Sequence, residues 1–120
     1  MSVNSDDDGP PIWNDQGMPD FEWHPVKAAS NEKKHKVSFE EARTIFQDTH
    51  RIEVPDDWHS DEEQRYLGIG RSFQGRILSV YYTLRLNRIR IISARRAERS
   101  ERDEYEAYPE QERDRHPKQI

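Results

Sequence analysis

The sequence predicts an α+β domain, in which two helices near its start and one near its end accompany an antiparallel sheet. Apolar residues recur at helical spacing between residues 25 and 46, and the spacing changes to two from Arg65 onward. Turn residues divide this later part into three strands that follow one another as a meander. The expected order of elements is therefore β-α-α-β-β-β-β-α. The helical pair should cover one face of the sheet, and the other face should be open except where the last helix lies across it.

The domain should span residues 20–108 of a 120-residue chain in which 36% of residues are charged and only 32% are hydrophobic. Residues 1–19 carry an acidic triplet and two adjacent prolines, and residues 109–120 begin with a helix-stopping proline. Neither segment has the apolar residues to join a core, so we expect both to be disordered.

A short strand and a helix open the predicted domain. Residues 21–23 (FEW) alternate apolar and polar side chains, as a half-buried strand does. Pro25 suits the first position of a helix, with His24 in the N-cap position before it. This helix should run to about Lys34, where basic residues meet the negative end of the helix dipole.

The second helix begins at a capping signal. Ser38 is the expected N-cap, Glu41 follows three residues later as its capping-box partner, and Val37 can pack on Ala42. The apolar residues of this helix fall on one face and should enter the core: Phe39, Ala42, Ile45 and Phe46.

Four strands and a last helix should follow. The strands are expected near 52–54, 65–72, 76–84 and 89–94, with the acidic loop 55–63 after the first and a tight turn at 85–88 before the last. The helix over 96–108 has few apolar residues, so most of its surface should face solvent.

The net charge of −5 conceals a segregation of charge. Residues 1–63 hold 6 Lys/Arg against 16 Asp/Glu, whereas residues 64–102 hold 10 Arg against 2 Glu and no lysine. Arginine offers a planar fork of donors that matches either phosphate or carboxylate. The arginines could therefore bind an anionic ligand, or they could pair with the carboxylates of the acidic half, and composition leaves both open.

Several functional classes find no support in the sequence. There are no cysteines, the five histidines have no ligand spacing, and no glycine-rich phosphate loop is present, so we expect no metal or cofactor. No apolar run is long enough for a membrane span, and the acidic start differs from a signal peptide. We expect a soluble, cytoplasmic protein.

The remaining functional groups would suit RNA cleavage without a metal, which needs a base, cations for the phosphate and an acid. Arg65, Arg90 and Arg95 could supply cations, His35 or His59 proton transfer, and Glu63 the orientation of an arginine. Lys27, Lys34, Arg88 and Tyr81 could bind RNA. Tyr81 would do so by stacking bases, as could Tyr66 and Tyr82, because tyrosines on a sheet can stack bases. Each residue also has a structural alternative: Tyr66, Tyr81 and Tyr82 as core residues, His59 as a loop residue and His35 as a helix cap.

Between residues 21 and 105 the chain resembles the BrnT family, the toxins of a type II toxin–antitoxin system. The resemblance rests on ordered groups of residues: Phe21 to Lys27, Asn31, Lys34-His35, Val37 to Phe39, Glu41-Ala42, His59-Ser60, Glu63, Arg65-Tyr66, Ile69-Gly70, Ile89 to Arg95, Ala97, Glu101-Arg102 and Tyr105. It implies a RelE-like ribonuclease fold and metal-independent RNA cleavage that arrests translation. It also implies a BrnA-like antitoxin, contact with operator DNA only through that antitoxin, and a toxin dimer in the complex.

Two departures from the family pattern affect the first helix. The family usually has Asp where this chain has His24, which is a poorer cap by about 1 kcal/mol. The family also favours Gly after the histidine, where this chain has Lys36, and a left-handed helix end would strain a residue other than glycine.

We therefore weigh three hypotheses. The chain is a toxin ribonuclease, a non-catalytic module that binds RNA or the ribosome, or a protein-binding subunit whose arginines pair with an acidic partner. Steep salt dependence of RNA binding separates the first two from the third, and product formation separates the first from the second.

Overall fold

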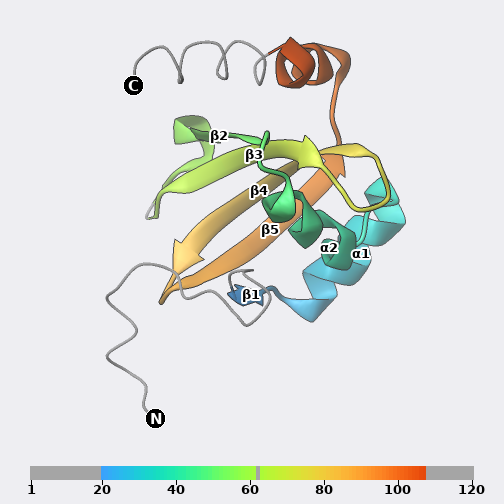
Figure 1. Cartoon of the computed structure of the whole chain (residues 1–120). Helices are drawn as coiled ribbons and strands as arrows, with labels where there is room; N and C mark the ends of the chain where they lie inside the picture. Colours follow the sequence, from blue (N-terminus) through green and yellow to red (C-terminus); the bar gives the residue numbers. More distant parts are fainter. Residues whose placement is uncertain (1–19, 62, 108–120) are drawn as a thin grey trace.

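The computed structural model describes residues 20–61 and 63–107, and the expected order of elements is confirmed. The predicted disordered segments, 1–19 and 109–120, lie outside the described residues. The described elements are β1 (Asp20–Glu22), α1 (Pro25–His35), α2 (Phe39–Ala42) with its 3-10 continuation η2 (Arg43–Gln47), β2 (Ile52–Pro55), the 3-10 turn η3 (Asp57–His59), β3 (Arg65–Arg71), β4 (Ile77–Arg85), β5 (Arg88–Arg96) and a helix over 99–107 (Figure 1).

The five strands form one sheet in the order β1-β5-β4-β3-β2. Strands β2 to β5 form the predicted antiparallel meander, whereas β1 runs parallel to β5, which the sequence did not indicate. Only Arg88 to Arg90 of β5 pair with β1. Further along β5, the side chain of Asn31 in α1 takes the place of a strand: its amide donates to the Ala94 carbonyl (2.8 Å) and its oxygen accepts from the Ala94 N–H (3.1 Å).

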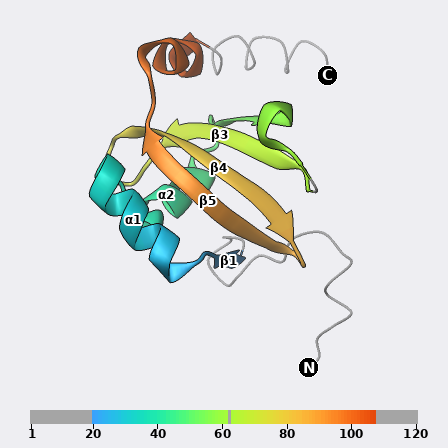
Figure 2. The same cartoon turned by 180° about the vertical axis from the view of Figure 1, so that it is seen from behind.

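The main core lies between the sheet and the pair α1 and α2, which cover one face as expected (Figures 1 and 2). Cross-strand partners face the same side of a sheet. Tyr66, Tyr82 and Ile91 form one such row on the covered face, so Tyr66 and Tyr82 are core residues rather than platforms for bases. The buried residues of this core are Val37, Phe39, Ala42, Ile45, Phe46, Leu78, Val80, Tyr82, Ile89, Ile91 and Ala94.

The opposite face carries three rows of cross-strand partners. The rows are Arg65–Thr83–Arg90, Leu67–Tyr81–Ser93 and Ile69–Ser79–Arg95. A bulge opposite Tyr81 and Tyr82 inserts Ile92 as an extra residue between the first two rows.

The last helix covers the third row of this face, which confirms its expected position. Tyr105 packs with Ile52, Ile69 and Ala97 in a second apolar cluster, and its hydroxyl donates to Asp48 (2.5 Å). The helix begins at residue 99 rather than at Arg96, because β5 continues through Arg96 and the Ala97 N–H still donates to the Ile77 carbonyl (2.9 Å).

The two capping residues expected at the helix starts are confirmed, but the capping box is wrong. Ser38 Oγ accepts from the Glu41 N–H (3.0 Å), and His24 Nδ1 accepts from the Val26 N–H (3.1 Å). The side chain of Glu41 does not return to Ser38. It is 2% exposed and binds Arg76 and Ser72, because β4 brings an arginine to this buried carboxylate.

Candidate active site

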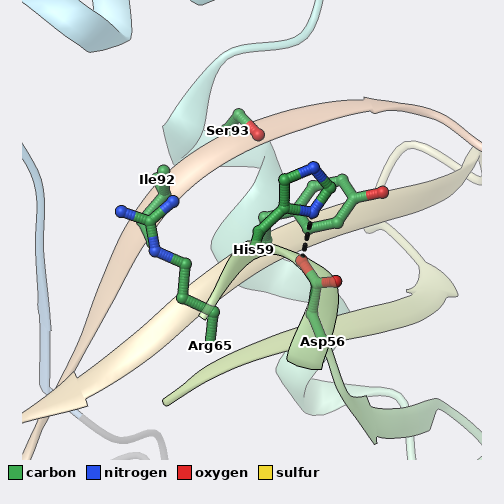
Figure 3. Close-up of a pocket in the computed structure, with 6 residues that line it drawn as sticks. Asp56, His59, Arg65, Ile92 and Ser93 are labelled. Atoms are coloured by element: carbon green, nitrogen blue, oxygen red, sulfur yellow. Dashed lines mark hydrogen bonds and ion pairs between the residues drawn. The ribbon is translucent and has the colours of Figure 1, made fainter. Parts of the chain in front are cut away.

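A hollow of about 280 Å³ opens on the face of the sheet opposite α1 and α2, which is called the uncovered face below although the last helix covers its third row. The hollow lies where the first two rows of that face meet the η3 turn (Figure 3). Six residues line it: Asp56, His59, Arg65, Tyr81, Ile92 and Ser93. Of the residues expected to act on RNA, the hollow brings together His59, Arg65 and Tyr81.

The sheet supplies one wall and the floor of this hollow. Arg65 begins β3, while Tyr81 and Ser93 face each other across β4 and β5. Because the bulge adds Ile92, both Ile92 and Ser93 line the hollow instead of alternating between the faces.

A ring of hydrogen bonds fixes the loop that carries His59. The Asp56 N–H donates to the Arg65 carbonyl (2.7 Å), and Ser60 Oγ donates to the Asp56 carbonyl (2.7 Å). The Arg65 N–H in turn donates to Ser60 Oγ (2.8 Å). Ser60 therefore ties the loop to the start of β3. This fixes the distance between the backbones of His59 and Arg65, whose side chains both line the hollow.

His59 is oriented by Asp56. Its Nδ1 lies 2.8 Å from Asp56 Oδ2, and the Asp56 side chain is only 12% exposed (Figure 3). Because a carboxylate only accepts hydrogen bonds, Nδ1 carries the hydrogen and Nε2 of the neutral ring is left with a lone pair. The ring also packs edge-on against Tyr81, with centroids 6.0 Å apart. An oriented imidazole with a lone pair on Nε2 is the arrangement that a general base requires.

Arg65 is the cation of the hollow. Within residues 20–61 and 63–107, no carboxylate forms an ion pair with it, and its buried Nε has no hydrogen-bond partner. A half-buried guanidinium without a counter-ion attracts an anion more strongly than one that is already paired.

The other two arginine candidates are paired with carboxylates. Arg90 lies in the same row as Arg65 but binds Glu22 of β1 (2.8 Å). Arg95 binds Glu101 of the last helix through two hydrogen bonds (2.8 and 3.0 Å) and donates to the Tyr81 hydroxyl (3.2 Å). For Arg90, the expectation that a carboxylate of the acidic half pairs with an arginine is confirmed, whereas the partner of Arg95 lies in the arginine-rich segment itself.

The Arg95–Glu101 pair perturbs both groups. Burial alone would raise the pKa of Glu101, but hydrogen bonds from Arg95, the Glu98 N–H and Ser79 outweigh it and lower the pKa to about 2. The hydrogen bonds to Glu101 raise the pKa of Arg95 despite burial. The pair therefore stays charged at neutral pH.

A second hollow, of about 350 Å³, lies between α1 and β5 and shares Ile92 and Ser93 with the first. It holds three more of the expected residues: Lys27, Lys34 and His35. His35 therefore faces a different hollow from His59.

Four expected residues line neither hollow: the paired Arg90 and Arg95, and also Glu63 and Arg88. Glu63 is exposed and forms no ion pair with the described arginines, so Asp56 is the carboxylate that lies beside the candidate site. Arg88 is exposed at the start of β5 and lines neither hollow.

Sequence reasoning missed three residues near this site. Asp56 precedes His59 by three residues, and a tight turn brings side chains at that spacing into contact. The sequence therefore contained a signal for the contact between Asp56 and His59. Ser93 has no activating sequence motif around it, and only the bulge explains its position in the hollow. Trp58, in η3 beside His59, is 88% exposed.

Two further findings concern metals and membranes. In the described part of the chain, no three His, Cys, Asp or Glu side chains gather as a metal-binding group. The helices in that part are too short or too polar to cross a membrane.

Comparisons with known proteins agree with this architecture. Residues 23–101 match the model of a family described as the ribonuclease toxin BrnT of a type II toxin–antitoxin system. No curated protein matches the chain. Among solved structures, the crystal structure of the Brucella abortus ribonuclease toxin BrnT matches with 19% sequence identity and a TM-score of 0.52, over 67% of this chain and 97% of that one. At that identity the likeness supports the α+β fold, while the family match covers well over half of the chain. The chain belongs to the BrnT family of ribonuclease toxins of type II toxin–antitoxin systems.

Proposed function

We propose that this toxin is a metal-independent endoribonuclease that acts on single-stranded RNA in the cytoplasm and so arrests translation. The observation that carries the proposal is the first hollow, where a histidine oriented by Asp56 shares the walls with Arg65, an arginine that pairs with no carboxylate of the described residues. Of the base, cation and acid that metal-independent cleavage needs, this hollow would supply the base and the cation, and water would be the acid.

In the proposed reaction, His59 Nε2 takes the proton of a ribose 2′-hydroxyl, and the 2′-oxygen forms a bond to the adjacent phosphorus. The bond from phosphorus to the 5′-oxygen breaks, that oxygen takes a proton from water, and the hydroxide left behind takes the proton from His59 Nε2. The products are a 2′,3′-cyclic phosphate and a free 5′-hydroxyl. Arg65 would stabilise the negative charge that develops on the phosphate oxygens, and the Ser93 hydroxyl would donate a hydrogen bond to one of them.

The paired arginines receive supporting roles in this proposal. Arg95 donates to the Tyr81 hydroxyl and lies over its ring (5.7 Å), so it would hold Tyr81 against His59 rather than bind phosphate itself. Arg90 lies two strands from Arg65 on the same face and would add positive potential beside the hollow.

Two aromatic residues would contribute differently to RNA binding. Tyr81 is half-buried and already contacts His59 and Arg95, so it would shape the hollow. Trp58 is exposed beside His59 and would stack a base of the RNA, as aromatic side chains do in proteins that bind single strands.

Membership of the family brings an antitoxin partner. We propose that this partner is BrnA-like, that the toxin is dimeric in the complex, and that the complex contacts operator DNA only through the antitoxin. A RelE-like relationship of the fold is part of the same proposal.

The test is the chemistry of the products. A single-stranded RNA should be cleaved in the presence of EDTA, and the fragments should carry 2′,3′-cyclic phosphate and 5′-hydroxyl ends. The same strand with 2′-deoxy nucleotides should be bound but not cut. Binding without cleavage would instead support a non-catalytic RNA-binding module, and absence of salt-dependent RNA binding would support a protein-binding subunit.

A further inference from the structure

The second hollow shares two lining residues of β5 with the candidate active site. Ile92 and Ser93 line both hollows, because the bulge places them at the boundary between the uncovered face and the α1 side of the sheet. A polymer bound across Ser93 would therefore meet both hollows in turn.

One side of helix α1 forms the far wall of this second hollow. Lys27, Asn31 and Lys34 recur at i, i+4 and i+7, so they lie on one face of the helix, with about 10 Å of helix axis between the two lysines. Asn31 cannot bind a ligand with its side chain, since its amide and its oxygen are hydrogen-bonded to Ala94 and Val37. Asn31 instead fixes the helix against β5 and so fixes both lysines relative to Ser93.

The charge of this wall is positive and uncompensated. Neither the Lys27 nor the Lys34 side chain forms an ion pair or hydrogen bond with another described residue, and no carboxylate lines the hollow. His35 stands at the same wall. Two unpaired ammonium groups spaced along the wall therefore suit a ligand with several anionic groups in a row better than a single carboxylate.

We propose that the second hollow is a phosphate subsite for the RNA backbone next to the scissile bond. The strand would cross the β5 bulge at Ser93, with one phosphate against Arg65 and a flanking phosphate against Lys27 and Lys34. This subsite rests on the proposed function of the first hollow. The subsite further predicts that a substrate long enough to reach both hollows binds more tightly than a dinucleotide that fills only the first.

The experiment measures binding apart from cleavage. Mixed-sequence 2′-O-methyl oligonucleotides of two and ten nucleotides cannot be cut, because the 2′-oxygen is blocked. Their affinities would be measured over a range of salt concentrations for the wild type and for Lys27→Ala and Lys34→Ala. Lys33→Ala is the matched control, because Lys33 is an exposed lysine of the same helix that does not line the hollow.

We expect the two wall variants to bind the ten-nucleotide strand several-fold more weakly and to bind the dinucleotide as the wild type does. The slope of log K against log salt should fall by about 0.7 for each lost phosphate contact. Lys33→Ala should change neither quantity. Lys27→Gln and Lys34→Gln keep most of the apolar stem and would replace the alanine variants if those unfold.

An equal loss of affinity in all three variants would mean that the lysines attract RNA only through diffuse charge, and it would overturn the subsite. Unchanged affinity in the two wall variants would overturn it as well. Absence of any binding by the wild type would overturn it too. Cleavage of RNA is scored separately. Wild-type cleavage with unaffected wall variants would leave the function and remove the subsite, whereas lysine-dependent binding without cleavage would leave the subsite and remove the function.

Discussion

Asp56 Oδ2 lies 2.8 Å from His59 Nδ1, and this contact fixes which nitrogen of the imidazole faces away from the carboxylate. Both residues belong to the loop that Ser60 ties to the start of β3. The proposed base therefore depends on a neighbour three residues earlier in the chain.

Asp56→Ala should lower kcat for RNA cleavage about a hundredfold and leave KM almost unchanged, because the ring loses its orientation while Arg65 remains. Single-turnover and steady-state cleavage assays measure the two constants. Asp56→Asn keeps an acceptor for Nδ1–H and should retain more activity than Asp56→Ala. A rise in KM with unchanged kcat would show that Asp56 binds substrate and does not position the base.

The Arg95–Glu101 pair holds the last helix to the sheet. Glu101→Gln should lower the free energy of unfolding by about 2 kcal/mol at pH 7, because Arg95 keeps only weaker hydrogen bonds. The pKa of Glu101 is about 2 in the folded chain and about 4.5 for an ordinary glutamate. The wild-type advantage should therefore be complete above pH 4.5 and be lost as the pH falls toward 2. Urea unfolding at a series of pH values measures this difference, and a difference independent of pH would contradict it.

Lys36 occupies the left-handed conformation at the end of α1, with φ 61°. This conformation strains a side chain that has a Cβ, so Lys36→Gly should stabilise the chain by about 0.5–1 kcal/mol, after the larger unfolded-state entropy of glycine is subtracted. Lys36→Ala removes the same ammonium and keeps the strain, so it should not stabilise. Urea unfolding of the three proteins tests this, and equal gains for Gly and Ala would assign the effect to charge.

Trp58→Ala should weaken binding of single-stranded RNA by about 1–3 kcal/mol, the usual contribution of one stacked base. The variant should unfold at the wild-type temperature, because Trp58 is 88% exposed. Phe73→Ala is the control, since Phe73 is also exposed (69%) but lies between β3 and β4 and not in η3 beside His59. Fluorescence anisotropy with a labelled RNA measures both affinities. Equal affinities of Trp58→Ala and the wild type would rule out stacking.

Local signals in the sequence were sufficient for the order of elements. The cap at Ser38, the turn between β4 and β5, and the alternation in β3 each act over a few residues. The parallel pairing of β1 with β5 joins residues about 68 positions apart, for which the sequence has no local signal.

The contacts of the candidate site residues also divide into local ones, which the sequence can indicate, and long-range ones, which it cannot. Arg90 meets Glu22 across 68 residues, and Glu41 meets Arg76 across 35. Such ion pairs depend on the register of the sheet, so composition could not say which arginines would lack a carboxylate partner among the described residues. The closeness of Asp56 and His59, by contrast, was accessible from their spacing in the loop.

The most direct test of the central claim compares two histidine variants in RNA cleavage. His59→Asn removes the proposed base, and His50→Asn changes a histidine that does not line the hollow. Both proteins should keep the circular dichroism spectrum and melting temperature of the wild type. We predict that His59→Asn cleaves single-stranded RNA about 10² to 10⁴ times more slowly, while His50→Asn cleaves at the wild-type rate. Full activity of His59→Asn would contradict the assignment of the first hollow as the active site.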